Sequence, residues 1–269
     1  MSNTQHTSFT GSIPALYDRH LGPVLFEPYA RDLAGRMPAH EGARILETAC
    51  GTGVATRRML ERLPASARLV ATDLNEGMLD RAREALGRDP RVEWRVADAQ
   101  QLPFPEGSFD AIAMQFGIMF VLDKPLALRE ALRVLRSGGR LVYNAWESFD
   151  KNAFGRIANN VVKSVFPVDP PTFYMTPFGD HDPAEHARRA QAAGFHEVKV
   201  ENVSFESLSE SAEHFAVGLI RGNPVSVAIS ERGVAHEVVE RRVADALRRE
   251  LGDRPVRASL RAWVITAVK

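Results

Sequence analysis

A glycine turn and a distant acid suggest a nucleoside site in the first third of this chain. Gly51 and Gly53 follow an apolar run, and the next apolar run ends at Asp73, twenty residues after Gly53. Glycines let a turn bring its backbone close to a ligand, and an acid at the end of the second strand accepts hydrogen bonds from the two ribose hydroxyls. The spacing therefore predicts a strand–turn–helix–strand unit that holds a nucleoside.

The glycine spacing also distinguishes between two cofactors. A dinucleotide site has the pattern G-x-G-x-x-G, whose third glycine packs the helix on the strand. Counted from Gly51 the third position is Thr56, and counted from Ala49 it is Val54, so that glycine is missing. Glu47 lies two residues before the turn, where a carboxylate complements the ammonium and sulfonium charges of S-adenosylmethionine. S-adenosylmethionine is favoured, and an NAD-dependent oxidoreductase is the alternative.

Five stretches resemble, in order and spacing, the motifs of the class I S-adenosylmethionine-dependent methyltransferases. Residues 47–53 resemble the motif written D/E-x-G-x-G-x-G, with Ala49 in place of the first glycine, where alanine fits if its φ is negative. The other four are residues 72–79, 97–104, 108–112 and 132–141. Phe116-Gly117 followed by Asp123-Lys124 looks closest to the quinone-type (ubiquinone/menaquinone) C-methyltransferases and their small-molecule relatives. After Trp146 the sequence does not follow that branch.

The resemblance implies S-adenosylmethionine as the cofactor, S-adenosylhomocysteine as its product, and roles for the matching positions. Asp73 is expected to bind the ribose hydroxyls, and Asp98 the adenine amino group. Glu47 is expected to organise the ammonium end through the turn or water. The alternatives are a strand-end acid, a loop cap and a helix cap, respectively. The other expected cofactor contacts are Ala49, Gly51, Thr52, Gly53, Leu74, Met78, Ala99 and Gln115.

Three side chains are candidates for the methyl-transfer step itself. Gln115, just past the fourth strand, is expected to face the methyl-transfer centre. Tyr17 lies in an N-terminal segment that folds over the cofactor in this family, and the alternative is a core aromatic residue. His181 lies between two aspartates that could make it a base, and the alternative is an exposed loop histidine with Asp182 as a helix cap. The histidines show no metal-ligand spacing, so no metal is predicted.

Hydrophobic periodicity indicates the elements that must position these residues. Strands are predicted at 45–49, 69–73, 92–96, 109–114, 141–145, 198–205 and 260–268. Helices are predicted at 54–63, 76–86 and 125–135, the last stopped by Gly138-Gly139. The alternation predicts an α/β fold, a doubly wound, seven-stranded, mostly parallel sheet of the Rossmann-like methyltransferase type with helical cap insertions.

The rest of the chain is expected to form a lid and a cap. Residues 1–40 are predicted as an N-terminal helical lid, disordered to residue 11, with two short helices over 13–37 broken near Pro23 and Pro28. The methyltransferase domain is predicted to span 41–269, with cap insertions at about 147–180 and 206–256 and helices at 152–166, 183–193, 210–221 and 234–251. The many Phe residues of the cap predict an apolar pocket for a small aromatic or largely apolar acceptor, methylated on O, N or C.

Composition limits the kinds of partner and the cellular compartment that we expect for this protein. The 34 basic and 34 acidic residues balance, which disfavours nucleic acid, and the single Cys50 predicts a reducing, cytoplasmic setting without disulfides. A small-molecule substrate, no membrane and a monomer or homodimer are expected. The alternative functions are a quinone-biosynthesis-type C-methyltransferase, a non-catalytic S-adenosylmethionine-binding module, and a nucleic-acid or protein methyltransferase. The last is disfavoured because residues 114–117 read Met-Gln-Phe-Gly rather than Asn/Asp-Pro-Pro-Tyr.

Overall fold

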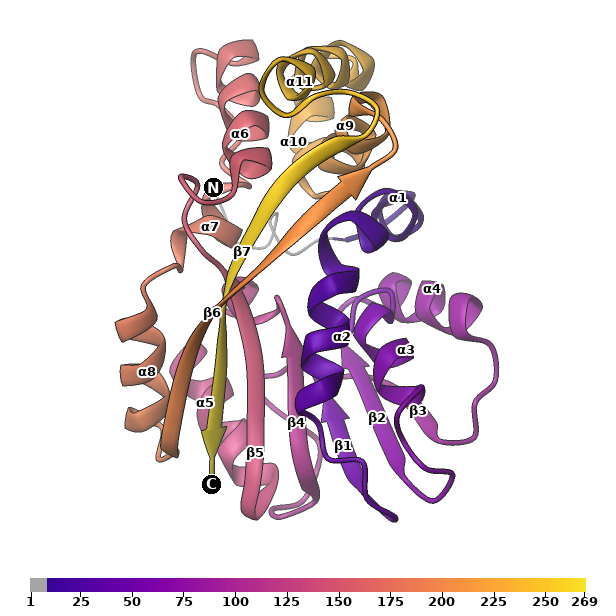
Figure 1. Ribbon diagram of the computed structural model, residues 1–269, viewed down its shortest axis with the longest axis vertical. Helices are drawn as coiled ribbons and strands as arrows, with labels where there is room; N and C mark the ends of the chain where they lie inside the picture. The colour runs from indigo at the N-terminus through magenta and orange to yellow at the C-terminus, as the bar shows by residue number, and fades with distance from the viewer. Residues whose placement is uncertain (1–8) are drawn as a thin grey trace.

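A single mixed β-sheet organises the chain, which a computed structural model describes over residues 9–269. Its strand order is β3-β2-β1-β4-β5-β7-β6, with β1 to β5 parallel and β7 antiparallel to both of its neighbours (Figure 1). This is the predicted doubly wound, mostly parallel sheet of seven strands. The strands are β1 (Arg44–Glu47), β2 (Arg68–Asp73), β3 (Val92–Val96), β4 (Phe109–Gln115), β5 (Leu135–Trp146), β6 (His196–Ser209) and β7 (Val256–Val268).

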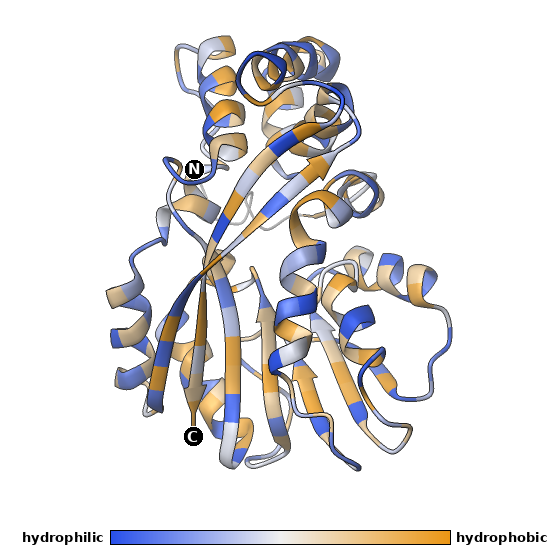
Figure 2. Ribbon diagram, in the orientation of Figure 1, coloured by the Kyte–Doolittle hydropathy of each residue, from blue (hydrophilic) through white to orange (hydrophobic). Residues whose placement is uncertain are grey.

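Helices cover both faces of the sheet and extend beyond its upper edge (Figure 1). The apolar runs of the central strands follow from this, because a parallel strand covered on both faces meets no water on either side (Figure 2). The helices are α1 (Ile13–His20), η2 (Gly22–Phe26), α2 (Glu27–Arg36), α3 (Val54–Leu60), α4 (Glu76–Leu86), η3 (Ile118–Phe120), α5 (Lys124–Val134), α6 (Ala153–Val165), α7 (Met175–Gly179), α8 (Pro183–Ala192), α9 (Ala212–Arg221), α10 (Val225–Glu231) and α11 (His236–Leu251).

The β6–β7 hairpin continues past the sheet and carries a helical cap. The pairing of β5 with β7 ends at Trp146 and Ala262, whereas β6 and β7 stay paired to Ser209 and Val256. Helices α6, α9, α10 and α11 gather around the protruding hairpin, beyond the carboxyl ends of β1, β2 and β4 (Figure 1). The predicted strands 198–205 and 260–268 are therefore too short, because the sequence pattern did not show that the hairpin leaves the sheet.

The Gly138-Gly139 pair does not stop a helix, contrary to the sequence-based expectation. Helix α5 ends at Val134, and β5 already begins at Leu135, which has an extended backbone. Gly138 has a φ of 72° and donates its N–H to the Lys269 carbonyl, while Gly139 accepts from the Lys269 N–H. The two glycines thus form an irregular strand segment held by the carboxyl terminus.

The lid also differs in detail from its prediction. Residues 1–8 of the predicted disordered stretch lie outside the described residues, but Phe9 is buried against Ile13 and Met78. Pro28 does not break a helix, because it lies in the first turn of α2, where its missing N–H has no partner to lose. Pro23 lies in the π-helical turn η2 that links α1 to α2.

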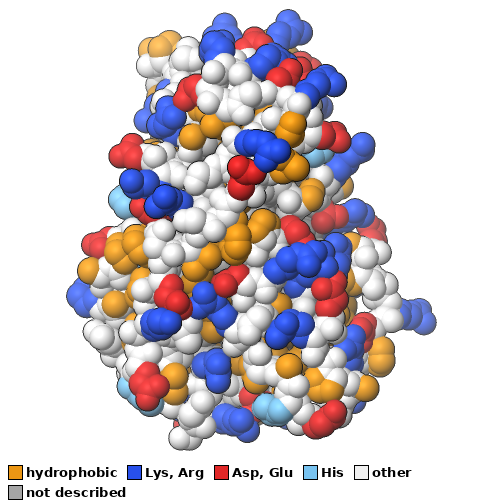
Figure 3. Space-filling model, viewed as in Figure 1, with side chains coloured by type: hydrophobic (Ala, Val, Ile, Leu, Met, Phe, Trp, Pro, Cys, Tyr) orange, Lys and Arg blue, Asp and Glu red, His pale blue; other side chains and the backbone are white. Residues whose placement is uncertain are grey.

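Two further observations concern the whole described chain. Within residues 9–269, every helix is too short or too polar to traverse a lipid bilayer. Basic and acidic side chains are interspersed over the face that Figure 3 shows, with an apolar strip at the junction of the sheet domain and the cap.

Helix α8 begins as predicted, since the Asp182 carboxylate accepts the Ala184 N–H at its first turn.

Candidate functional site

The turn after β1 lies where the strand order reverses. Strand β1 is flanked by β2 on one side and by β4 on the other, so the chain leaves this point in both directions across the sheet. Ligands of open α/β sheets bind at such a point, outside the carboxyl ends of the strands. Gly51 and Gly53 have φ angles of 56° and 82°. Ala49 has a φ of 52°, so the negative φ with which alanine fits a compact turn easily is not the one that it adopts here.

Asp73 ends β2 beside this turn and already organises it. Its Oδ2 accepts the Gly51 N–H at 2.9 Å, and its Oδ1 accepts the Asn75 N–H at 2.8 Å. The residue is 7% exposed, and burial raises the pKa of its carboxyl group, although these N–H donors act in the opposite direction. Oδ1 also lies 3.4 Å from Asn75 Nδ2, a long contact that a ligand hydroxyl can replace, and Oδ2 keeps a second acceptor position.

Glu47 lies behind the turn and is fully buried. Its Oε2 accepts the Thr56 hydroxyl at 2.6 Å, and its Oε1 has no hydrogen-bond partner among the described residues. Burial raises the pKa of Glu47 to about 8. The hydrogen bond from Thr56 acts in the opposite direction but offsets only part of this rise. Because Glu47 does not line the cavity described below, its free oxygen acts on a ligand group only through the turn.

The raised pKa of Glu47 makes the stability of the fold depend on pH. The folded chain keeps this proton up to about pH 8, whereas a free glutamate loses it near 4.5. Between those values the folded state binds more protons than the unfolded state, so stability falls as pH rises. We expect wild-type stability between pH 6 and 8 to fall by about 1 kcal/mol per pH unit more than that of Glu47→Gln. Urea unfolding at pH 6, 7 and 8 measures it, and equal slopes for both proteins would contradict it.

A cavity of about 240 Å³ opens at this edge of the sheet. It is lined by most of the predicted cofactor contacts, namely Ala49, Gly51, Asp73, Leu74, Met78, Asp98, Ala99 and Gln115. Glu47, Thr52 and Gly53 do not line it. Thr52 is buried, and Gly53 caps α3 in a left-handed conformation, packed against Ala82 and Leu86 of α4. We call this space the donor cavity.

Asp98 also lines the donor cavity, with its carboxylate already engaged. Oδ1 accepts the Gln100 N–H at 2.8 Å, and both oxygens lie 3.1 Å from Gln100 Nε2. The loop that carries Asp98 is held by α5, since Glu130 accepts the Leu102 N–H and Arg133 donates to the Leu102 carbonyl. Asp98 is therefore held in place before any ligand arrives.

Gln115 and Tyr17 meet at the boundary between sheet and lid. Gln115 ends β4, donates Nε2–H to the Phe26 carbonyl at 2.9 Å, and leaves its buried Oε1 without a partner among the described residues. Tyr17 of α1 stacks on Phe26 at 4.9 Å between ring centroids. Burial, then Asp73 and Asp18, raise the pKa of Tyr17, so its phenol stays protonated. Both residues line the donor cavity.

His181 lies apart from these residues. It lines neither this cavity nor the one described next. Its Nδ1 lies 2.9 Å from the Phe178 carbonyl, and its own carbonyl accepts the Trp263 indole N–H at 2.8 Å. Asp182 is the helix cap of the alternative interpretation, so the geometry favours a loop histidine.

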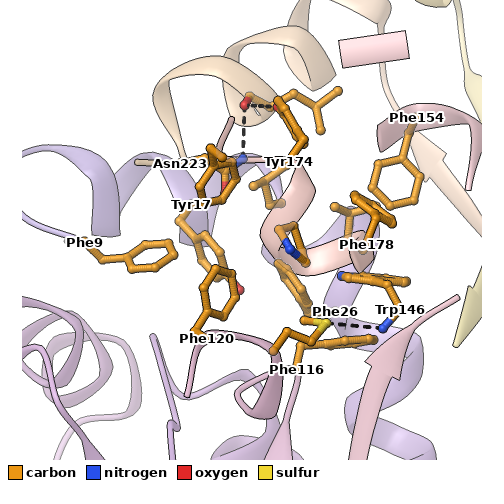
Figure 4. Close-up of a pocket in the computed structure, with 16 residues that line it drawn as sticks. Phe9, Tyr17, Phe26, Phe116, Phe120, Trp146, Phe154, Tyr174, Phe178 and Asn223 are labelled. Atoms are coloured by element: carbon orange, nitrogen blue, oxygen red, sulfur yellow. Dashed lines mark hydrogen bonds between the residues drawn. The ribbon is translucent and has the colours of Figure 1, made fainter. Parts of the chain in front are cut away.

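A second, apolar cavity of about 60 Å³ lies under the cap. It shares Phe9, Tyr17, Phe116 and Phe120 with the donor cavity, so these four side chains form the partition between the two spaces. Figure 4 shows aromatic rings from the lid, the sheet and the cap converging on it. Its other aromatic residues are Phe26, Trp146, Phe154, Phe173, Tyr174 and Phe178. We call this space the acceptor cavity.

Phe116 is the centre of the partition and has a strained backbone. It has a φ of 53°, and the fully buried Asn144 of β5 accepts its N–H at 2.8 Å. Its ring stacks on Trp146 at 4.0 Å with an interplanar angle of 15°. A bulky residue in the left-handed region costs free energy that the surrounding contacts must offset, and such residues cluster at functional sites.

Several lining residues were not found from the sequence. Asn75, Gln100, Gly117, Val121 and Leu122 line the donor cavity next to predicted residues. Their positions within the matched motifs and just after the fourth strand were the available signal. Across the described lining of both cavities, the titratable side chains are Asp73, Asp98, Tyr17 and Tyr174. That lining holds no lysine, arginine or histidine, so it is poorly suited to an anionic acceptor.

Comparisons with known proteins identify methyltransferases as relatives of this chain. A family model described as a methyltransferase domain matches residues 46–143. The chain is 37% identical over 177 residues to the ubiquinone/menaquinone biosynthesis C-methyltransferase of Dinoroseobacter shibae, covering 60% of this chain and 70% of that protein. It is 34% identical over 131 residues to the protein of the same name from Geobacter sulfurreducens, covering 48% and 51%. The chain thus spans about half the length of several curated relatives that it matches.

Solved structures show the same fold at low sequence identity. A phosphoethanolamine N-methyltransferase 2 of Haemonchus contortus, solved with S-adenosylmethionine, superposes with a TM-score of 0.64 at 17% identity, covering 100% of this chain and 60% of that one. A putative methyltransferase from Bacillus halodurans has a TM-score of 0.58 at 20% identity, covering 89% and 98%. The strand order and the turn after β1 are thus those of a methyltransferase fold.

Proposed function

Because the chain belongs to the class I S-adenosylmethionine-dependent methyltransferases, close to the ubiquinone/menaquinone C-methyltransferase type, we propose that it methylates a small, uncharged, aromatic or largely apolar acceptor. S-adenosylmethionine is the methyl donor, and S-adenosylhomocysteine is the product. The observation that carries the proposal is the pair of adjoining cavities. The cavity that contains the motif carboxylates Asp73 and Asp98 is separated from an aromatic one only by four shared side chains.

The residues of the donor cavity fit this cofactor. Asp73 offers its two oxygens to the ribose, and Asp98 lines the same cavity and would meet an adenine amino group. Leu74 is 57% exposed and Leu122 is 61% exposed although both are apolar, which suits them to the faces of an adenine ring. An added Cβ at Gly51 would meet no atom within 4 Å, so the turn leaves open space for the methionine part.

The chain's own residues position and shield the reaction. When bound, S-adenosylmethionine supplies an electrophilic methyl group on a sulfonium. Gln115 Oε1 is a free acceptor beside the partition, and Tyr17 keeps its proton, so both can orient polar groups of the ligands. The aromatic lining excludes water from the acceptor side. Holding two reactants in line contributes roughly 7–11 kcal/mol in favourable cases.

The proposed acceptor does not require a general base from the protein. Among the described residues of the two linings, Asp73 and Asp98 are engaged by backbone or side-chain donors, and burial raises the pKa of Tyr17 and Tyr174. None of the four is set up as a general base next to the partition. An acidic phenol, an enol or a ring nitrogen is nucleophilic without one and is therefore the favoured acceptor type.

A quinone-type C-methyltransferase is the second candidate. The relative from Dinoroseobacter shibae bears that name and supports it. Against it, part of the acceptor cavity, including Phe173 and Tyr174, is lined by residues after Trp146, where the sequence departs from that branch. The interspersed charges of Figure 3 and the uncharged cavity favour a small molecule over nucleic acid. A cytoplasmic monomer or homodimer remains part of this proposal.

Two measurements test the proposed function. Calorimetric titration with S-adenosylhomocysteine is expected to show one site per chain. A screen of phenols, quinols and nitrogen heterocycles with radiolabelled S-adenosylmethionine is then expected to yield a labelled product with at least one uncharged ring compound. Binding without transfer to any acceptor would favour a non-catalytic binding module, and the absence of binding would refute the proposal.

We propose that the chain comprises a lid over 1–40 and a domain over 41–269 with cap insertions at about 147–180 and 206–256. This organisation predicts that a substitution in the cap changes acceptor preference without changing cofactor affinity. Phe173 is 4% exposed and lines the acceptor cavity but not the donor cavity. Phe173→Ala is expected to change relative rates with different acceptors by about tenfold, because it enlarges that cavity. It should also lower the free energy of unfolding by about 3 kcal/mol. Calorimetry should show S-adenosylhomocysteine affinity within about threefold of wild type, and a larger loss would contradict the division.

A further inference from the structure

The acceptor cavity contains one side-chain amide, that of Asn223. Asn223 follows α9 and is 7% exposed, although it lines a cavity that is otherwise aromatic, aliphatic or phenolic. Figure 4 places it beside Tyr174, on the side of the cavity away from Phe116. It does not line the donor cavity, whereas Phe116 lines both. The amide therefore lies at the end of the acceptor cavity remote from the methyl donor.

The donor group of this amide is already committed. Nδ2 lies 3.0 Å from the Leu219 carbonyl and 3.4 Å from the Gly218 carbonyl, in the last turn of α9, where carbonyls lack helical partners. The amide also lowers the pKa of the adjacent Tyr174 phenol, as a hydrogen-bond donor does, against a larger rise caused by burial. These contacts fix which end of the amide is nitrogen.

The acceptor atom of the amide has no such commitment. No donor in the described part of the chain makes a hydrogen bond to Asn223 Oδ1. Tyr174, the neighbouring hydroxyl, donates to the Leu219 carbonyl at 2.5 Å and so has no proton to offer. Because Asn223 lines a largely apolar cavity, this amide oxygen is free to accept a hydrogen bond from a donor group on a ligand bound there.

We propose that Asn223 determines acceptor specificity by accepting a hydrogen bond from a hydroxyl or ring N–H at the end of the acceptor opposite the methylated atom. The substrate class is thus an uncharged ring compound with a donor at its far end, rather than a pure hydrocarbon or an ether. This inference rests on the proposed function, since it assigns the acceptor cavity to the methyl acceptor.

Phenol and toluene form a matched pair of probes, because they differ in one group of similar size. Their dissociation constants are measured by ligand-observed NMR with S-adenosylhomocysteine bound. We expect Asn223→Leu to reduce the preference for phenol over toluene by about tenfold relative to wild type, the worth of one buried hydrogen bond. Asn159→Leu is the control, since it makes the same substitution at a buried asparagine of α6 that lines neither cavity.

The control separates specificity from stability. If Asn223 only caps α9, both variants should lower the melting temperature and leave the phenol preference unchanged, which would overturn the inference. Equal losses of preference in both variants, or no saturable binding of phenol to wild type, would overturn it as well. Failure of the proposed function is a different result, namely no binding of S-adenosylhomocysteine to wild type.

A measurement on the wild type covers the case in which Asn223→Leu does not fold. Phenol is expected to shift the ¹³Cγ resonance of Asn223 downfield, because a hydrogen bond to Oδ1 polarises that carbonyl. Toluene is expected to leave its position nearly unchanged. Identical shifts with the two probes would contradict a hydrogen bond to this atom.

Discussion

Replacing Asp73 by alanine is expected to weaken S-adenosylmethionine binding by about 100-fold or more. Hydrogen bonds to a charged group contribute about 1.5–3 kcal/mol each, and the variant loses two to the ribose. It also loses the bond from Asp73 Oδ2 to the Gly51 N–H, which holds the turn in place. Isothermal titration with S-adenosylmethionine and S-adenosylhomocysteine measures the loss.

Two further variants show whether the site is correctly located. His181→Ala is expected to change the affinity by less than about threefold, because His181 lines neither cavity. Asp73→Asn keeps the size of the side chain but replaces one oxygen by a donor, so we expect an intermediate loss. An effect of His181→Ala as large as that of Asp73→Ala would mean that the cofactor lies elsewhere.

The second large effect is expected from Gly117→Ala. A Cβ at Gly117 would lie 2.5 Å from the Ala49 Cβ and 2.9 Å from Met114 Cγ, closer than such atoms can approach. The β1 turn and the end of β4 would have to separate, and overpacking of this kind costs about 1–3 kcal/mol. Because Ala49 and Gly117 both line the donor cavity, we also expect at least about a tenfold loss of cofactor affinity.

Gly35→Ala is the matched control for this substitution. Gly35 lies in α2, and a Cβ there would meet no atom within 4 Å. Alanine is favoured over glycine in a helix by about 0.5–1 kcal/mol, so this variant should be more stable than wild type. Denaturant unfolding should therefore show a lower stability for Gly117→Ala and a higher one for Gly35→Ala than for wild type. Titration with S-adenosylhomocysteine should show a loss of affinity only for Gly117→Ala. A neutral Gly117→Ala would contradict the close packing of the two chain segments.

The sequence predicted the sheet from local patterns, and most of the residues proposed to bind the cofactor line one cavity for the same reason. Strands β1, β2 and β4 contain short apolar runs, β3 alternates apolar and charged residues, and helix α4 matches its predicted bounds of 76 and 86. Asp73 ends β2 and Asp98 follows β3, so their positions at one sheet edge follow from the parallel topology. Residues that share a sheet edge in this way can be predicted without knowing which distant segments contact each other.

Other features depend on contacts between distant segments, which a single sequence does not show. Ala49 keeps a positive φ because the turn packs against Gly117, 68 positions later, and no local rule predicts this. Glu47 and Thr52 belong to the motif, yet they lie behind the cavity rather than in it. The amide of Asn223 meets the acceptor cavity only because the cap folds back over the lid.

The hairpin that outgrows the sheet has a consequence for how this enzyme could diversify. Beyond Ala262, β6 and β7 pair only with each other, so the segment between Val203 and Ala262 enters and leaves the domain at two adjacent points. A stretch anchored in this way can be exchanged between homologues as one block without altering the strand order beneath it. Recombination at these two points is a route to chimaeras with a new acceptor range and the same methyl donor.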